Sequence, residues 1–297
     1  MAALLVRLLR HSSPDGDRTA VVVPRPDGDR ALDLGAVPVA RVLADDALLA
    51  DARRRLAAAE DGSGQDAAAL PRVADLRLLP PVTPGKILCI GYNYRGHVPP
   101  GDPERPVPEV PDVFVKTPNT LAAPGDPVTI PAGADDVDYE GEIALVIGRG
   151  GRDIPLADAA AHIGGYTLMD DVSERTWQGR SSQWTLGKCA DGFAPLGPWL
   201  VTPDDVPDPH DLRLEVVRDG RVTVSQGTAD LVFPMSALVH HLSQGMTLEP
   251  GDVISTGSPQ KLPDALAAHR PLADGDAVTV RVEGIGSLTT AFRKDPR

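Results

Sequence analysis

The sequence predicts an α+β protein in which strands predominate, and three observations lead to this class. Short β-branched runs recur along the chain, and a tight turn precedes several of them, as in "PGDPVTI", "PGDVIST" and "DGDAVTV". Helical patterns are few. The proline-rich stretch "LRLLPPVTPGK" is typical of a rigid connector. We therefore expect a small N-terminal α/β domain at residues 1–78 and a β-rich domain at residues 79–297.

The N-terminal section predicts three short strands and then a helix. The runs "RLLRH", "TAVVVP" and "ALDLG" are typical of strands, and the turn-rich segments "SSPDGD" and "RPDGD" separate them. The stretch "ADDALLADARRRLAAAE" has the composition and spacing of a helix, and "DGSGQD" ends it.

The larger section predicts strands interrupted by two helices. The helical stretches are "LADAAAHIG" and "MSALVHHLSQG", and Gly245 is the expected end of the second. In "DYEGEIALVIG", residues 143–147 are apolar without a break, which is typical of a strand covered on both faces.

Composition restricts the function classes. The chain of 297 residues carries 29 basic and 42 acidic side chains, a formal charge of −13, which disfavours nucleic acid as a partner. No apolar run approaches 18 residues, so we expect no membrane span, and "MAALLVRLLRHSS" is too short in its apolar part for a secretory signal. Cys89 and Cys189 are expected to be free thiols, and the protein to be cytoplasmic.

Acidic side chains gather where the apolar strand begins. Glu140 and Glu142 are two apart, so on a strand they point to the same face, with Asp138 behind them. Asp170 and Asp171 end the strand-like segment of "GGYTLMDDVSERTWQ". One reading is an edge strand with solvated acids. The other is a site for a hard divalent ion, because oxygen ligands without cysteine or paired histidine favour such ions, and three crowded anions would otherwise raise one another's pKa.

Six ordered motifs identify a resemblance that covers roughly residues 84–290. They are "ILCIGYNYRGH", "DVFVKTPNTL", "DYEGEIALVIG", "GGYTLMDDVSERTWQ", "LGKCADGFAPLGPWL" and "LEPGDVISTGSP". The chain resembles the fumarylacetoacetate hydrolase superfamily. The resemblance implies a mixed β-sandwich roll, a catalytic Mg²⁺ or Mn²⁺, a frequent homodimer, and chemistry on 2-oxo acids or 1,3-dicarbonyl compounds. Residues 1–78 are similar to the small N-terminal domain of many bacterial members.

By position, the resemblance implies a role for eight residues. Its metal ligands fall on Glu140, Glu142 and Asp171, and its general base falls on His97. A lysine directed toward metal and substrate and a substrate-contacting glutamine fall on Lys188 and Gln178, and residues that hold the substrate carboxylate fall on Thr256 and Ser258. Without their motifs, Lys188 would be an ordinary surface lysine and His97 a turn residue.

One position departs from the resemblance. Hydrolytic relatives carry a glutamate three residues after the histidine, on a lid helix, whereas this chain has Pro100 within "HVPPGDPERPVPEVP". Glu104 and Glu109 are the candidate substitutes. The expected activity is metal-dependent hydrolysis of a C–C bond in an acylpyruvate-like compound. The alternatives are a tautomerase, isomerase or decarboxylase acting on a similar 2-oxo acid, which needs no activated water, and an inactive ligand-binding homologue.

Overall fold

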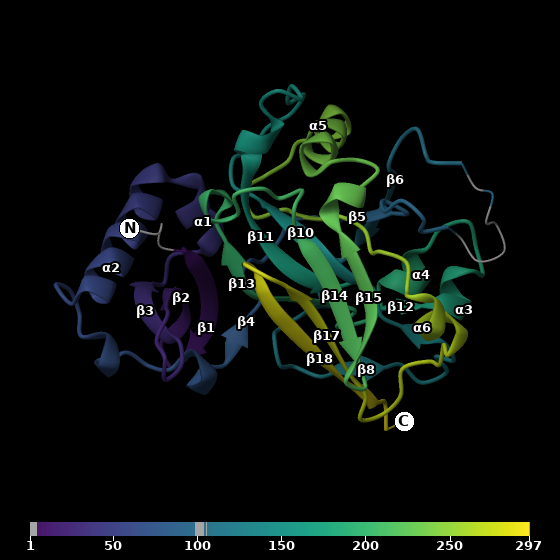
Figure 1. The fold of residues 1–297 in the computed structure, drawn as a ribbon, viewed down its shortest axis with the longest axis horizontal. Coiled ribbons are helices and arrows are strands. Elements are labelled where there is room, and N and C mark those ends of the chain that lie inside the picture. Colours follow the sequence, from purple (N-terminus) through teal and green to yellow (C-terminus); the bar gives the residue numbers. More distant parts are fainter. Residues whose placement is uncertain (1–4, 99–103, 105, 297) are drawn as a thin grey trace.

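The computed structural model of the protein describes residues 5–98, 104 and 106–296, and two sheets form most of it (Figure 1). In its described part, the larger sheet has 11 strands. Its main path runs through β3 (Arg30–Gly35), β2 (Gly16–Val23), β1 (Arg7–Ser13), β13 (Ala194–Val201), β11 (Ile163–Asp170), β10 (Gly141–Ile147), β16 (Val253–Ser255), β5 (Ile87–Gly91) and β6 (Asp112–Lys116). Two short strands lie off this path: β4 (Leu78–Leu79) beside β1, and β7 (Leu121–Ala122) beside β13.

A second sheet packs on the first. Among the described residues it has five strands, in the order β15 (Arg221–Gly227), β14 (Arg213–Arg218), β17 (Ala277–Val282), β18 (Gly286–Lys294) and β8 (Val128–Ile130). A two-stranded ribbon of β9 (Val137–Asp138) and β12 (Ser173–Glu174) lies apart from both. The pairs β16–β5, β13–β7 and β18–β8 are parallel and the other pairs antiparallel, so the sheets are mixed. The expected α+β class is confirmed.

Strand β10 is buried on both faces because it separates two cores. Ile143, Leu145 and Ile147 belong to the core between the two sheets, whereas Ala144 and Val146 belong to a core shared with the N-terminal section. Successive side chains of a strand point to opposite faces, so this alternation places Glu142 on the side away from the second sheet.

The helices are short and lie outside the sheets. They are α1 (Val39–Ala44), α2 (Asp46–Asp61), α3 (Arg175–Gln178), α4 (Thr185–Lys188), α5 (Met235–Gly245) and α6 (Pro263–Ala267). The predicted helices around residues 46–60 and 235–245 are confirmed. Asp45 caps α2 by accepting hydrogen bonds from the backbone amides of Ala47 and Leu48, and Gly62 ends it at φ 78°.

The helix expected in "LADAAAHIG" is wrong in extent. This segment forms only the 3₁₀ turn Ala159–His162, and β11 begins at the next residue, Ile163. Pairing of β11 with β10 and β13 takes the backbone groups that a longer helix would need.

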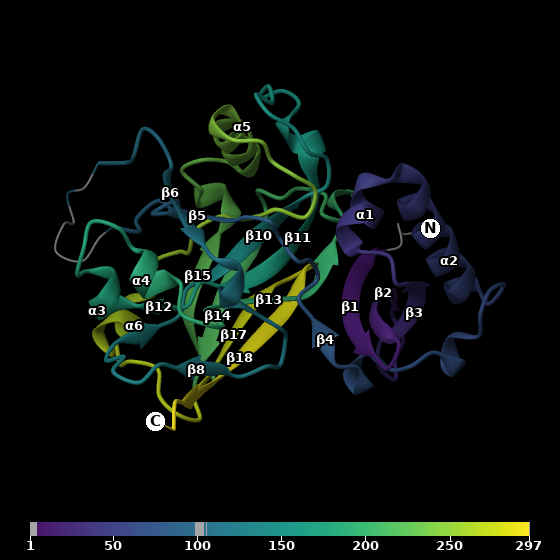
Figure 2. The ribbon, with the colours of Figure 1, turned by 180° about the vertical axis from the view of Figure 1, so that it is seen from behind.

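The N-terminal section extends the larger sheet, and Figures 1 and 2 show it at one end of the molecule. Strand β1 pairs with β13 through Arg7 opposite Val201 and Leu8 opposite Leu200. Part of the expected connector forms β4, which pairs with β1. The boundary at residues 78 and 79 stays a prediction. In the described part of the chain, no helix has the length and apolarity to cross a membrane.

Candidate metal centre and active-site cavity

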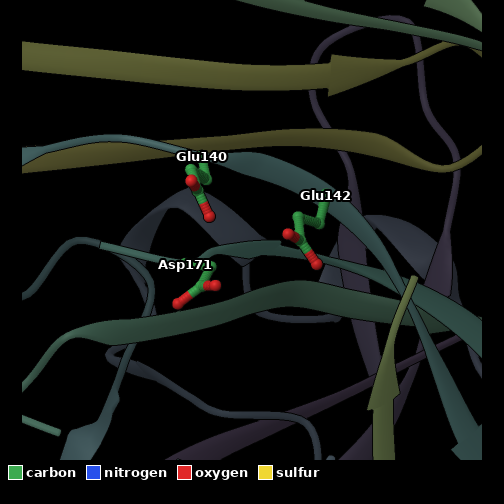
Figure 3. A group of neighbouring side chains, drawn as sticks. All are labelled: Glu140, Glu142 and Asp171. Atoms are coloured by element: carbon green, nitrogen blue, oxygen red, sulfur yellow. The ribbon is translucent and has the colours of Figure 1, made fainter. Parts of the chain in front are cut away.

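Three carboxylates converge at the junction of β9, β10 and β11 (Figure 3). Glu140 lies in the two-residue gap between β9 and β10, Glu142 lies on β10, and Asp171 directly follows β11. Gly141 is paired with Asp170, so the start of β10 lies beside the end of β11. One ligand oxygen from each of the three acids lies within 4.8 Å of the others.

Gly141 makes this arrangement sterically accessible. A Cβ atom at this position would lie 2.5 Å from Cγ2 of Val216 and 2.9 Å from Cγ2 of Val280, both on the second sheet. Only glycine lets the strand approach that sheet so closely. The residues on either side of it, Glu140 and Glu142, therefore project away from the second sheet and toward Asp171.

Glu142 is the least compensated acid of the three. It is 1% exposed, and its Oε2 accepts hydrogen bonds from the Ser255 hydroxyl and, at 3.0 Å, from the Gly257 amide. Burial, together with the charges of Asp171 and Glu140, raises its pKa well above the usual range. A divalent cation would offset this repulsion, and the all-oxygen donor set suits Mg²⁺ or Mn²⁺. The three residues thus fit the metal that the resemblance implies.

Two buried lysines approach the triad. The Lys188 Nζ lies 2.7 Å from Oε2 of Glu140 and 2.6 Å from Oδ2 of Asp171. Burial opposes its charge, but these two acids raise the pKa of Lys188 above its usual value. Lys116, at the end of β6, donates to Oδ1 of Asp171 at 2.6 Å and to the Val172 carbonyl at 3.0 Å. Lys188 is therefore a charged group beside the ligands and not a surface lysine.

Arg175 joins the triad to a fourth acid. Its Nη1 lies 2.6 Å from Oε1 of Glu140, and its Nη2 lies 3.0 Å from Oδ2 of Asp138. Although burial acts against ionisation, Arg175 and Lys188 hold the pKa of Glu140 well below its usual range. Asp138 also accepts a hydrogen bond from Lys261, so this acid pairs with two cations instead of joining the metal ligands.

The His97 ring is held by a backbone carbonyl. Its Nδ1 lies 2.7 Å from the Ser258 carbonyl oxygen. A carbonyl can only accept, so Nδ1 carries the proton and Nε2 is left as a base. Burial lowers the pKa of His97. Glu104 and Glu109 are exposed, while Pro100 lies outside the described residues.

A cavity of about 520 Å³ connects these groups. The predicted site residues that line it are His97, Glu140, Glu142, Gln178, Lys188 and Ser258. Asp171, the third acid of the triad, is fully buried and does not line the cavity. Thr256 is also fully buried, and its hydroxyl donates to the Ile143 carbonyl at 2.9 Å and does not line the cavity. The assigned roles of these residues stay predictions.

Sequence reasoning assigned no role to Lys116, Arg175 or Lys261. Lys116 ends "DVFVK", a strand in which Val113 and Val115 are exposed, so no local pattern predicts that the lysine itself is buried. Arg175 precedes Gln178 by one helical turn on α3, which places both on one face. Lys261 carries no such local signal.

The fold is of the β-sandwich type, and its carboxylate triad could hold a divalent metal ion. The chain belongs to the fumarylacetoacetate hydrolase superfamily, because the family model "Fumarylacetoacetate (FAA) hydrolase C-terminal" matches residues 86–293. The resemblance inferred from the sequence is thereby confirmed.

Similar proteins include named enzymes. The mitochondrial oxaloacetate tautomerase fahd2 of Xenopus laevis is 36% identical over 293 residues, which cover 97% of this chain and 90% of the relative. The human mitochondrial oxaloacetate tautomerase FAHD2A is 41% identical over 249 residues, which cover 82% of this chain and 75% of the relative.

Two solved structures add to this comparison. The 5-carboxymethyl-2-hydroxymuconate delta-isomerase of Mycobacterium smegmatis has a TM-score of 0.77 at 34% identity, covering 97% of this chain and 100% of that one. The maleylpyruvate hydrolase of Sphingobium sp. SYK-6, solved with manganese(II) and pyruvate, has a TM-score of 0.75 at 27% identity, covering 97% and 99%.

Proposed function

We propose that the protein is a metal-dependent tautomerase that interconverts the enol and keto forms of a 2-oxo dicarboxylic acid. The observation that carries the proposal is the contact of His97 Nδ1 with the Ser258 carbonyl. A carbonyl fixes the tautomer of the ring but, unlike a carboxylate, supplies no full charge to stabilise an imidazolium. Such a base suits a reversible proton transfer better than the activation of water.

The names of similar proteins support the same class. Two relatives are oxaloacetate tautomerases and one structural neighbour is an isomerase, and all three are at least 34% identical to this chain. Keto–enol exchange moves one hydrogen between carbon and oxygen and breaks no C–C bond, so it needs no nucleophile.

The metal would supply electrophilic chemistry at this site. Glu140, Glu142 and Asp171 would hold Mg²⁺ or Mn²⁺, and the ion would polarise the 2-oxo group. In the forward direction, Nε2 of His97 takes a proton from the carbon beside the carbonyl. The C–H electron pair forms the C=C bond and the carbonyl π pair moves to oxygen. The protonated His97 then returns the proton to this oxygen, so the base is regenerated.

Lys188 and Gln178 act on the substrate in this mechanism. The Lys188 ammonium lies where negative charge develops on the enol oxygen and stabilises it there. Gln178, held at 3.2 Å by Nη1 of Arg175, directs its amide toward the cavity and orients the acid. The lowered pKa of His97 keeps the base neutral at neutral pH.

C–C hydrolysis of an acylpyruvate-like compound is the second candidate. A maleylpyruvate hydrolase is among the structural neighbours, and His97 lines the cavity in which water would have to be activated. Decarboxylation of the same 2-oxo acid would use the metal and Lys188 alone.

One experiment separates these reactions. The purified protein, freed of metal and then given Mg²⁺ or Mn²⁺, is mixed with a panel of 2-oxo acids that includes oxaloacetate. Ultraviolet absorbance follows the conjugated enol, and mass spectrometry detects added water or lost CO₂ against a protein-free control. We expect metal-dependent enol decay without a change of mass. Addition of water as the main metal-dependent reaction would establish the hydrolase instead.

We also propose that the enzyme works as a cytoplasmic homodimer. Cys89 and Cys189 are free thiols, which suits a reducing compartment. On β6, Val113 and Val115 are exposed, and α4, which packs against this strand, exposes Leu186 to 75%. A second copy of the chain would cover this apolar surface, and light scattering coupled to size exclusion measures the mass in solution.

A further inference from the structure

The cavity has a second wall that sequence reasoning left without a role. Residues 258–269 form this wall, which includes α6, and Lys261, Leu266 and His269 face the cavity from it. His269 lies 3.0 Å from Oδ1 of Asp136, another residue of the lining. Lys261 thus brings a positive charge to the cavity beside Asp138, the residue of β9 that it contacts.

The three cations of the lining differ in how many of their donors are already used. Arg175 gives Nε and Nη2 to Asp138 at 3.2 and 3.0 Å, and Nη1 to Glu140 at 2.6 Å. Lys188 gives two hydrogens to carboxylates. Among the described residues, Lys261 has one hydrogen-bond acceptor, Oδ1 of Asp138. An ammonium group has three N–H donors, so two of them remain for a ligand.

The position of Lys261 is fixed although its donors are not all used. Its Nζ lies 4.3 Å from the centre of the Tyr139 ring, and its side chain is only 11% exposed. The ring and Asp138 hold the ammonium in place, which lowers the cost of ordering it around an anion.

The charges of the site favour an anionic substrate. Four cations, Lys116, Arg175, Lys188 and Lys261, contact three acids, Asp138, Glu140 and Asp171. Among the described residues, Glu142 accepts from the Ser255 hydroxyl and the Gly257 amide, and Asp136, also in the lining, contacts His269. A divalent ion beside these groups therefore leaves an excess of positive charge that an anionic substrate would balance.

The chain of contacts from the triad to Lys261 is short. Glu140 contacts Arg175, Arg175 contacts Asp138, and Asp138 contacts Lys261. A cavity of about 520 Å³ has room for an acyclic acid that spans this separation. We propose that Lys261 binds the second carboxylate of the substrate, the one distant from the metal, and so makes the enzyme selective for 2-oxo dicarboxylic acids. This inference rests on the proposed function and names its specificity residue.

The test compares oxaloacetate with its 4-monomethyl ester, which keeps the carbon chain and removes the distal charge. The wild-type enzyme with Mn²⁺ should show a KM about ten- to a hundredfold lower for the diacid, as expected for hydrogen bonds to a charged group. Lys261→Met should abolish this difference by raising the KM for the diacid, and Lys261→Arg should restore part of it. Lys294→Met, which removes an exposed lysine on β18, is the matched control.

Two results would overturn the inference. One is an unchanged preference for the diacid in Lys261→Met. The other is an equal loss of activity toward both compounds in Lys261→Met, with activity recovered in the double variant Asp138→Asn, Lys261→Met. In that case Lys261 would only neutralise the charge of Asp138. If the wild-type enzyme converts neither compound, the proposed function fails by itself. Calorimetry of the same two compounds with the Mn²⁺-loaded variants then decides the role of Lys261 through binding alone.

Discussion

The metal side of the cavity and its loop side, the wall that includes His97 and residues 258–269, differ in what holds their polar side chains. On the metal side, Glu140 and Glu142 flank Gly141 at the start of a strand buried on both faces, and each acid has partners from other elements. On the loop side, His97 and Lys261 come from loops, and the side chain of each has one hydrogen-bond partner among the described residues. The strand ends therefore hold the acids of the triad, whereas the loops carry the proposed base and the proposed specificity residue.

The two glutamates show how strongly local contacts act on the metal side. They are two residues apart, and Glu142 is buried while Glu140 is partly exposed. Burial and neighbouring acids raise the pKa of Glu142, whereas Arg175 and Lys188 lower that of Glu140. Glu140 would therefore be ionised before the metal binds, whereas the charge of the metal would help to ionise Glu142.

The largest expected effect comes from breaking the metal side. Glu142→Ala removes a ligand and leaves the Ser255 hydroxyl and Gly257 amide without their acceptor. Mn²⁺ affinity should fall by more than about a hundredfold, since even the partners of ligands contribute about ten- to a hundredfold, and activity should vanish with it. Calorimetry measures the affinity. Glu215→Ala, on the second sheet, is the control, and an unchanged affinity in Glu142→Ala would remove this acid from the ligand set.

The next prediction concerns the base on the loop side. His97→Ala should lower the rate of enol–keto exchange about a hundred- to ten-thousandfold, the usual range for a positioned base, while Mn²⁺ affinity stays the same. His241→Ala, an exposed histidine of α5, is the matched control. Stopped-flow absorbance of the enol measures the rate, and activity retained in His97→Ala would assign the proton transfer to another group.

The pH dependence gives a second measure of His97. The neutral ring is the base, and burial lowers its pKa below the usual value of 6.5. Activity should therefore be retained as the pH falls through 6.5 and be lost only as it falls through the lower pKa. A loss of activity with an apparent pKa above 6.5 would contradict the assignment of His97 as the base.

Lys188 separates metal binding from catalysis on the metal side, because it contacts two of the proposed ligands without being one of them. Lys188→Met should reduce kcat about a hundred- to a thousandfold, as for loss of one group that stabilises a developing oxyanion. Mn²⁺ affinity should not fall, since the variant frees oxygens of Glu140 and Asp171 from a competing cation. Steady-state kinetics and calorimetry on the same preparation test both statements. A parallel loss of metal binding and kcat would show that Lys188 supports the ligands themselves.

How much could be predicted from the sequence depended on how local each feature is. The i, i+2 spacing of Glu140 and Glu142, the helix that ends at "DGSGQD" and the turn-initiated strands are local, and the structure contains them. The contacts of Lys116 with Asp171 and of Lys261 with Asp138 join residues 55 and 123 positions apart, so no local pattern carries them. The helix predicted near residue 159 does not form for the same reason, because the pairing of β11 with distant strands determines the conformation of that segment.

The smallest expected effect separates two roles for Thr256. The resemblance assigns it to the substrate, but its hydroxyl donates to the Ile143 carbonyl at 2.9 Å beneath the cavity. Thr256→Val should lower the free energy of unfolding by about 0.5–1.5 kcal/mol, the net contribution of one hydrogen bond, and should leave KM within about twofold, because a factor of two is under 0.5 kcal/mol. Denaturant unfolding and steady-state kinetics measure the two quantities.

Thr290 provides the matched control for that substitution. It is equally buried, and among the described residues its hydroxyl has no hydrogen-bond partner. Thr290→Val therefore removes a polar atom without breaking a bond, and stability should stay the same or rise. A KM for oxaloacetate raised about tenfold or more in Thr256→Val, with the stability of both variants equal, would place the Thr256 hydroxyl on the substrate, because only a contact with the ligand loses about 1.4 kcal/mol in binding and nothing in folding.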